Sequence, residues 1–143
     1  MNDIGRKHYF NYRIPLYEID LGNALYHGNY FHLFELARDD FWRTIGFPYA
    51  EIMANRMHLT IVESHCKYRK PLRYDEVVQV VTGVKKIGSR SLVLHQGIFR
   101  DGGRELCTEA TISMVCVTFE GKPVRLPEDF RRHLEKWVEE EKQ

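Results

Sequence analysis

The chain has 143 residues, of which 43% are hydrophobic and 13% aromatic, and this composition can fill one apolar core. The 21 basic and 20 acidic side chains leave a formal net charge of +1, which excludes a general electrostatic attraction to nucleic acid. No apolar run approaches the ~18 residues of a membrane span. We therefore expect a single domain over residues 1–143, with no nucleic-acid partner and no membrane span.

Cysteine and histidine usage argues against disulfides and metal sites. Cys66, Cys107 and Cys116 are odd in number, lack a C-x-x-C spacing and lie among apolar residues, which predicts reduced core thiols in a cytoplasmic protein. The 7 histidines form neither an H-E-x-x-H motif nor a paired Cys/His knuckle. We expect neither a metal nor a cofactor.

The first half of the chain predicts one strand followed by one long helix. Residues 8–17 mix aromatic and β-branched side chains with polar ones, as strands do, and Pro15 makes this an edge or bent strand. From Tyr30 onward, apolar residues recur at helical spacing for about 16 residues. Gly46 and Pro48 then stop the helix.

The second half predicts four strands and a closing helix. The strands cover residues 59–69, 77–87, 91–100 and 104–119, and the short turns between them indicate an antiparallel meander. The helix is amphipathic, and it is marked by Pro127 and by apolar residues at helical spacing: Phe130, Leu134, Trp137 and Val138.

Together these elements predict an α+β domain with the hotdog fold, in which an antiparallel five-stranded sheet wraps around one long helix and a C-terminal amphipathic helix is added. Such a sheet leaves strand edges exposed. Because a second copy would cover them, we expect a homo-oligomer, either a dimer or a tetramer.

The segment that joins the first strand to the long helix carries the most informative residues. It places the carboxylate of Asp20 shortly before a helix N-terminus, and Gly22 and Asn23 tolerate the left-handed backbone of a tight turn. An aspartate in this position can serve as an acid–base group, or it can simply end the strand or cap the turn. Spacing alone leaves both interpretations open.

The start of the helix provides the second half of a candidate active site. The N–H groups of His27, Gly28 and Asn29 are expected to lack helical partners and to point outward. Such groups, aided by the helix dipole, stabilise negative charge that develops on a carbonyl oxygen under nucleophilic attack. Gly28 also allows a ligand to approach the backbone closely.

A set of motifs in residues 17–38 recurs together in one known family. The set consists of Asp20, Tyr26-His27, Asn29-Tyr30 and Phe34-Glu35-x-Ala37-Arg38, in that order. It resembles the signature of the 4-hydroxybenzoyl-CoA thioesterase family and its Tol-Pal-associated acyl-CoA thioesterase relatives. The resemblance covers about residues 8–127 and includes Tyr68-Arg69-Lys70-Pro71-Leu72. It implies that Asp20 is the catalytic aspartate and that the His27 backbone N–H is the oxyanion donor.

Two residues depart from the pattern of this family. Members usually carry Asp-Thr-Asp where this chain has Glu18-Ile19-Asp20, so the hydroxyl of the middle position is absent. The usual glycine three residues after the aspartate is Asn23. Asparagine is the best non-glycine residue for a left-handed turn, so we expect the loop to keep its shape.

The predicted substrate-binding residues on and near the helix are Tyr26, Asn29, Tyr30, Glu35 and Tyr49. The resemblance implies that Glu35 and Tyr49 lie at the acyl end of the pocket. For two of them another role is equally compatible with the sequence. Glu35 can form an intrahelical ion pair with Arg38, and Tyr49 can be a loop residue packed on the core.

The turn over residues 85–91 is the candidate site for coenzyme A. It gathers cations and hydroxyls around Gly88, and such groups suit phosphate oxygens: Lys86, Ser89, Arg90 and Ser91. The resemblance implies the same use. A solvated basic hairpin tip is the alternative.

The predicted function is hydrolysis of an acyl-CoA to the free acid and coenzyme A, with Asp20 as nucleophile or general base. Coenzyme A is then part of the substrate. A competing serine nucleophile in a G-x-S-x-G motif is absent. Two alternatives remain: a hotdog hydratase or dehydratase, which usually pairs a histidine with a carboxylate, and a non-catalytic acyl-CoA-binding hotdog domain.

Overall fold

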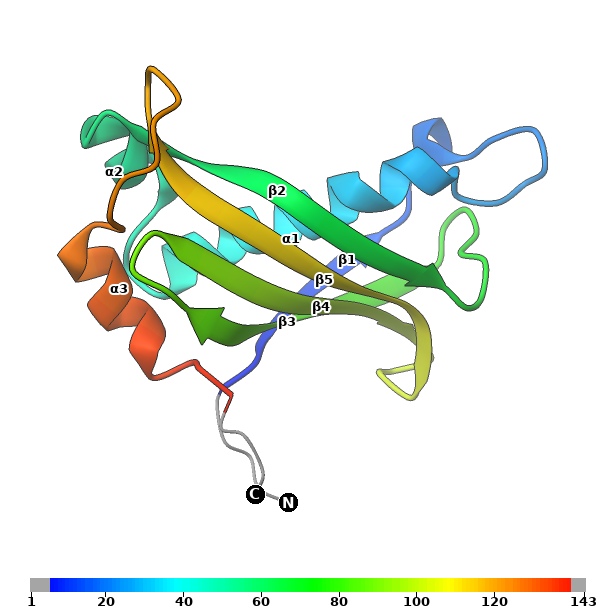
Figure 1. Ribbon diagram of the computed structural model, residues 1–143. Helices are drawn as coiled ribbons and strands as arrows, with labels where there is room; N and C mark the ends of the chain where they lie inside the picture. The colour runs from blue at the N-terminus through cyan, green and yellow to red at the C-terminus, as the bar shows by residue number, and fades with distance from the viewer. Residues whose placement is uncertain (1–5, 140–143) are drawn as a thin grey trace.

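The computed structural model describes residues 6–139, and in it one long helix lies against one face of a five-stranded antiparallel sheet (Figure 1). Its strands and helices are, in chain order, β1 (His8–Arg13), α1 (Tyr30–Thr44), α2 (Tyr49–Ala54), β2 (Met57–Tyr68), β3 (Val77–Ile87), β4 (Ser91–Arg100), β5 (Glu105–Thr118) and α3 (Glu128–Glu135). Two short 3-10 helices, Leu16–Glu18 and His27–Asn29, precede α1. The predicted hotdog fold is confirmed.

The strands lie in the order β1-β3-β4-β5-β2, and every neighbouring pair is antiparallel. β3, β4 and β5 form the expected meander. β2 does not pair with β3 as a continuous meander requires; it pairs with β5 at the far edge, so this part of the prediction is wrong. At about 4.8 Å per strand, β2 and β3 lie about 14 Å apart. The link over residues 69–76 is long enough to cross that distance.

The first strand is shorter than predicted, ending at Arg13 rather than at Tyr17. Pro15 has no N–H group to continue the ladder, so the chain turns into the 3-10 helix Leu16–Glu18. The Ile14 N–H still reaches the Glu76 carbonyl, at 3.0 Å.

Two helical segments also differ from the prediction. α2 was not expected; Pro48 has an extended backbone, Tyr49 starts the helix, and Ile52 is its buried anchor. α3 ends at Glu135, before Trp137 and Val138. Those two residues return to the core instead, because the Trp137 ring packs edge-on against another aromatic ring and Val138 forms a parallel bridge with Val84.

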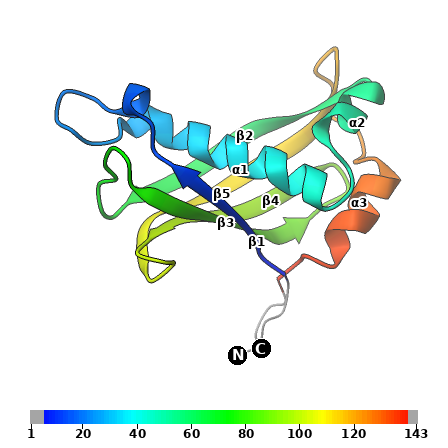
Figure 2. The same ribbon diagram turned by 180° about the vertical axis from the view of Figure 1, so that it is seen from behind.

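α1 crosses the concave face of the sheet and packs its apolar side on it (Figure 2). The apolar residues that it buries are Tyr30, Leu33, Phe34, Ala37, Phe41 and Trp42. The side chains that meet them alternate along the sheet and include Val78, Val80, Val84, Leu92, Leu94, Ile98 and Ile112. The helix stops at the expected place, where Gly46 has a φ of 87°.

A polar cluster lies inside this apolar contact. Gln96 of β4 is 2% exposed; its Nε2 donates to the Phe34 carbonyl at 3.1 Å and to Thr82 Oγ1 at 3.0 Å. Its Oε1 accepts from Arg38 Nη1 at 3.0 Å. Burial lowers the pKa of Arg38, and the nearby charge of Glu35 opposes that effect. Gln96 therefore fixes α1 to the sheet by directional bonds.

Replacing Gln96 tests that role. Gln96→Leu should destabilise the protein by about 1–3 kcal/mol, because it leaves a buried guanidinium without its acceptor. Gln79→Leu on β3, where the side chain is on the outer face, is the matched control and should stay within about 0.5 kcal/mol. Urea unfolding of both variants measures the difference, and equal stabilities would refute the role.

Candidate active site

A hollow of about 230 Å³ lies beside the start of α1 and is lined by residues that could take part in catalysis. Three of the predicted site residues line it: Asp20, His27 and Tyr30. The remaining wall consists of Ala24, Leu25, Tyr68, Arg69, Lys70 and Pro71. We call it the Asp20 hollow.

Asp20 lies at the tip of a small backbone hairpin. Its N–H donates to the Ala24 carbonyl at 3.0 Å, and its carbonyl accepts from Asn23 N–H at 3.1 Å. Asn23 has a φ of 63°, so the expected left-handed residue is found there. The exposed carboxylate accepts one hydrogen bond from the Gly22 N–H, at 2.8 Å. The hairpin thus presents a carboxylate to the hollow without burying it.

The helix start offers fewer free donors than expected. The Asn29 N–H is used, because it donates to the Tyr26 carbonyl at 2.9 Å in the 3-10 turn. Within residues 6–139 no protein acceptor is found for the N–H groups of His27 and Gly28. A Cβ at Gly28 would lie 3.2 Å from the Tyr26 ring, so a larger residue there would require the ring to shift, and Gly28 itself is exposed.

Tyr68, which was not singled out as a site residue, closes the hollow beside His27. Its hydroxyl donates to the His27 carbonyl at 3.2 Å, and its ring lies 5.0 Å from the His27 ring and 4.8 Å from the Tyr30 ring. Burial raises the pKa of Tyr68 to about 12, with the Cys66 thiol as a second cause. The hydroxyl therefore remains a donor at neutral pH. Its place in the resembling stretch 68–72 was the only sequence signal.

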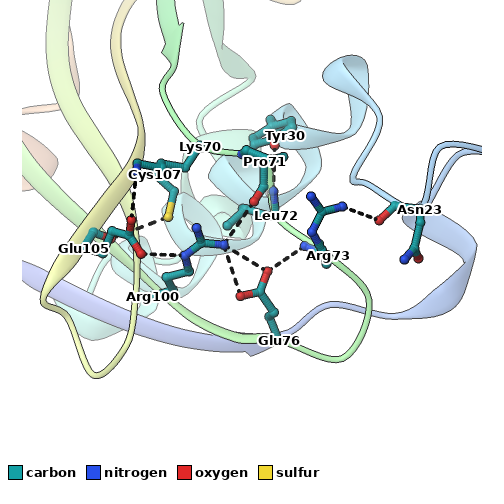
Figure 3. A network of polar contacts seen from close by, with 10 residues as sticks. All are labelled: Asn23, Tyr30, Lys70, Pro71, Leu72, Arg73, Glu76, Arg100, Glu105 and Cys107. Atoms are coloured by element: carbon teal, nitrogen blue, oxygen red, sulfur yellow. Dashed lines mark hydrogen bonds and ion pairs between the residues drawn. The ribbon is translucent and has the colours of Figure 1, made fainter.

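Arg100 of β4 holds Pro71, which is part of the wall of the Asp20 hollow; Figure 3 shows the polar contacts of Arg100. This guanidinium donates to the Pro71 carbonyl at 3.1 Å, to Glu105 at 2.8 Å and to Glu76 at 3.3 Å. Its hydrogen bond holds the pKa of the Glu105 carboxyl below the usual value. The link after β2 is consequently fixed to the sheet.

Two further contacts join this link to α1 and to the hairpin (Figure 3). The Leu72 N–H donates to the Tyr30 hydroxyl at 3.3 Å, and Arg73 Nη1 donates to the Asn23 carbonyl at 3.2 Å. Tyr30 is 2% exposed, and burial raises its pKa. Its hydroxyl is thus engaged in holding the wall of the hollow.

The two residues predicted at the acyl end of the pocket, Glu35 on α1 and Tyr49 on α2, lie farther along the chain. A second hollow, of about 600 Å³, lies between α1, α2 and the start of β2, and we call it the Tyr49 hollow. Its lining includes Glu35, Arg38, Trp42, Tyr49, His58, Leu59, Ile61 and Met114. Tyr49 is on a helix and not in a loop; its hydroxyl contacts His58 Nδ1 and accepts from the Leu59 N–H, both at 3.0 Å.

Three predicted residues at the helix start line neither hollow: Tyr26, Gly28 and Asn29. Tyr26 is 55% exposed, and Asn29 donates from Nδ2 to the Glu18 carbonyl at 3.1 Å. Glu35 forms no ion pair among the described residues; the pair on that part of α1 joins Asp39 and Arg43.

The candidate coenzyme turn lies at the opposite end of the sheet from the Asp20 hollow. β3 begins near the hollow and reaches the turn after 11 residues, about 36 Å at 3.3 Å per residue. Backbone contacts fix the turn: the Ser89 carbonyl accepts from Leu126 N–H and the Arg90 carbonyl accepts from Cys116 N–H. A single chain does not bring Lys86, Ser89, Arg90 or Ser91 near Asp20.

The sequence matches the model of a known family. The family model of the thioesterase-like superfamily matches residues 14–134. The chain belongs to this superfamily. The resemblance found in the sequence, to thioesterases with a hotdog fold, is therefore confirmed at the level of the family.

Individual members of the thioesterase-like superfamily are similar over most of their length. An acyl-CoA thioester hydrolase, YbgC of Escherichia coli O6:H1, is 29% identical over 116 residues, which cover 80% of this chain and 86% of the relative. The acyl-CoA thioesterase YbgC of Haemophilus influenzae is 25% identical, covering 85% and 90%. The crystal structure of a DHNA-CoA thioesterase from Staphylococcus aureus has a TM-score of 0.86 and 29% identity, covering 91% and 89%.

The structure gives little support to a cysteine nucleophile or to a metal site among residues 6–139. Burial raises the pKa of the thiols of Cys66, Cys107 and Cys116, which disfavours the nucleophilic thiolate form. Between residues 6 and 139 there is no cluster of three histidine, cysteine or acidic residues suited to a metal ion.

The described part of the chain contains no helix long and apolar enough to cross a membrane.

Proposed function

We propose that this chain is an acyl-CoA thioesterase that hydrolyses acyl-CoA to the free acid and coenzyme A. The observation that carries the proposal is the Asp20 hollow. It brings the Asp20 carboxylate together with the N-terminal end of the α1 helix, in a member of the thioesterase-like superfamily. The acyl-CoA thioesterase names of the two YbgC relatives, and the DHNA-CoA thioesterase structure from Staphylococcus aureus, support it.

In this proposal the two sides of the Asp20 hollow divide the chemistry. Asp20 either attacks the thioester carbon or removes a proton from an attacking water. The His27 and Gly28 N–H groups stabilise the charge that develops on the carbonyl oxygen. The coenzyme A thiolate then leaves. If Asp20 is the nucleophile, the acyl group remains on it as a mixed anhydride, and water hydrolyses that anhydride to release the free acid and restore the carboxylate. Neither route needs a metal or a further cofactor. Tyr68 orients the helix start through the His27 carbonyl.

The separation of the Asp20 hollow from the other two candidate regions supports a shared site. β2 is a 12-residue edge strand with β5 as its single neighbour in the sheet, and it exposes Ile61 and Val62 by 42% and 60%. Such an edge favours pairing with another strand. Antiparallel pairing of β2 with β2 of a second copy places the end of one strand beside the start of the other.

The consequence is a dimer with two composite sites. Tyr68 and the Asp20 hollow lie at the end of β2, whereas the Tyr49 hollow lies at its start. Pairing therefore brings the Asp20 hollow of one copy toward the Tyr49 hollow of the other, with Glu35 and Tyr49 contacting the acyl group. Ser91 is in register with Val115, and Val115 with Thr60, so the basic turn lies at the same end as the Tyr49 hollow. A tetramer of two such dimers is compatible with this arrangement.

The three free cysteines are compatible with a reducing compartment, and we propose the cytoplasm as the location.

The first test replaces the carboxylate. Asp20→Asn keeps the size of the side chain but cannot attack or accept a proton at neutral pH, so kcat for acyl-CoA hydrolysis should fall at least ~100-fold. Asp101→Asn, at an exposed turn, is the matched control and should keep parental kcat. Thiol release across a panel of short, long and aromatic acyl-CoAs measures both. Full turnover by Asp20→Asn would refute the assignment, and hydration of an enoyl-CoA without thiol release would favour the hydratase alternative.

The second test separates the backbone of His27 from its imidazole ring. Tyr26 has φ −65° and ψ 140°, the conformation that precedes proline readily, and His27 is the first residue of its helical turn. His27→Pro should therefore fold but lose one oxyanion donor, lowering kcat about 10²–10³-fold. His27→Phe keeps the N–H and should stay active. Circular dichroism checks both folds, and an inactive His27→Phe would instead assign the chemistry to the ring.

The third test asks whether the site is shared between copies. Lys86→Ala/Arg90→Ala should raise KM for acyl-CoA more than it lowers kcat, because phosphate contacts bind substrate and transition state alike.

Subunits of this variant mixed with Asp20→Asn subunits, after partial unfolding and refolding together, form hybrid dimers. If the site is shared, one of the two sites in each hybrid combines the intact Asp20 of one subunit with the intact basic turn of the other. Hydrolysis at low acyl-CoA concentration should then be faster than with either variant alone. If the site lies within one chain, the hybrids should hydrolyse acyl-CoA no faster than the variants do. Light scattering checks the oligomeric state, which must be a dimer or a larger assembly.

A further inference from the structure

Glu18 is a buried acidic residue near the Asp20 hollow to which the proposed mechanism gives no role. Its side chain is 4% exposed, and both carboxylate oxygens lie 3.1 Å from Nδ1 of His32 on α1. The His32 side chain is 61% exposed. The pair lines a separate hollow of about 520 Å³ on the other side of the hairpin, with Tyr12 and Tyr17.

The main chain of Glu18 is also engaged, at the base of the Asp20 hairpin. Its carbonyl accepts from the Tyr26 N–H at 3.3 Å and from Asn29 Nδ2 at 3.1 Å. The next residue, Ile19, bridges to Leu25. Glu18 thus links the two arms of the hairpin through its bond with Tyr26. It also joins the hairpin to the helix start through its contacts with Asn29 and His32.

The Asp20 side chain contributes little to its own placement. Among residues 6–139, the Asp20 carboxylate makes one hydrogen bond, which it accepts from the Gly22 N–H inside the same hairpin. On the other flank, the hairpin is attached to the link after β2 by the Leu25 N–H, which donates to the Leu72 carbonyl at 2.8 Å, and by Arg73. On the helix flank, the attachment rests on Glu18.

We propose that the Glu18–His32 pair is a positioning pair that sets the place of the Asp20 carboxylate relative to the free N–H groups of His27 and Gly28, in the 3-10 helix that precedes α1. It acts through the hairpin and does not touch the substrate. This inference rests on the proposed thioesterase function. Because misplacement of a reacting group by about 1 Å can cost ~100-fold in rate, loss of this contact should affect turnover more than substrate binding.

The test compares two replacements of His32. His32→Leu removes the donor at a half-exposed position, so the fold should survive, while kcat falls about 10- to 100-fold and KM stays within about twofold. His32→Asn places an amide donor near the position of Nδ1 and should recover most of the lost turnover. Arg104→Leu, which removes the exposed ion pair with Asp101, is the control and should keep parental kinetics.

The outcomes separate this inference from the proposed function. A His32→Leu protein with a lower melting temperature but parental kcat would show a merely structural pair. A loss of kcat that His32→Asn does not restore would also overturn the inference. Asp20→Asn, assayed in parallel, reports on the proposed function alone, since parental activity there refutes the role of Asp20 whatever His32 does.

Hydrogen exchange gives a readout that needs no substrate. The amides of Asp20 and Asn23 are bonded within the hairpin, so their exchange should accelerate in His32→Leu and return toward parental rates in His32→Asn. The amides of β4 should be unchanged. Unaltered exchange at Asp20 and Asn23 in His32→Leu would contradict the positioning role, even for a protein without measurable hydrolysis.

Discussion

The contact between α1 and the concave face of the sheet determines where the Asp20 hollow and the Tyr49 hollow lie. Apolar burial supplies most of its stability, but apolar contacts alone permit the helix to slide or rotate. The bonds from Gln96 to the Phe34 carbonyl, Thr82 and Arg38 remove that freedom. With the helix fixed, its first turn meets the end of β2 and its middle meets the start of β2.

The Asp20 hollow is built mainly from main-chain geometry. A left-handed Asn23 shapes the hairpin, a 3-10 turn leaves two N–H groups free, and carbonyls of Pro71 and His27 receive the bonds that hold the walls. The Tyr49 hollow, in contrast, is shaped by side chains such as Trp42 and Met114. A carboxylate and an oxyanion site can therefore be kept while the neighbouring hollow changes its shape and polarity.

Local sequence patterns predicted what local physics controls. The bounds of β3 and β4, the start of α1 at Tyr30 and the left-handed Asn23 were all predicted correctly, because alternation, helical spacing and turn chemistry determine them. The placement of β2 beside β5 was missed, since pairing across the sheet depends on residues far apart in sequence. The approach of Tyr68 to His27 was missed for the same reason. The long distance between Asp20 and the basic turn over residues 85–91 was also missed, because spacing along the chain does not reveal it.

The strand order also has a consequence for the order of folding. β3, β4 and β5 are joined by short turns, whereas Met57 pairs with Thr118 and His8 pairs with Thr82. Closing long loops slows the formation of such pairs, so the central meander should form early and both edge strands should dock late. The Asp20 hollow lies between the segment after β1 and the link after β2. It should therefore be among the last regions to assemble and the first to open in the native protein.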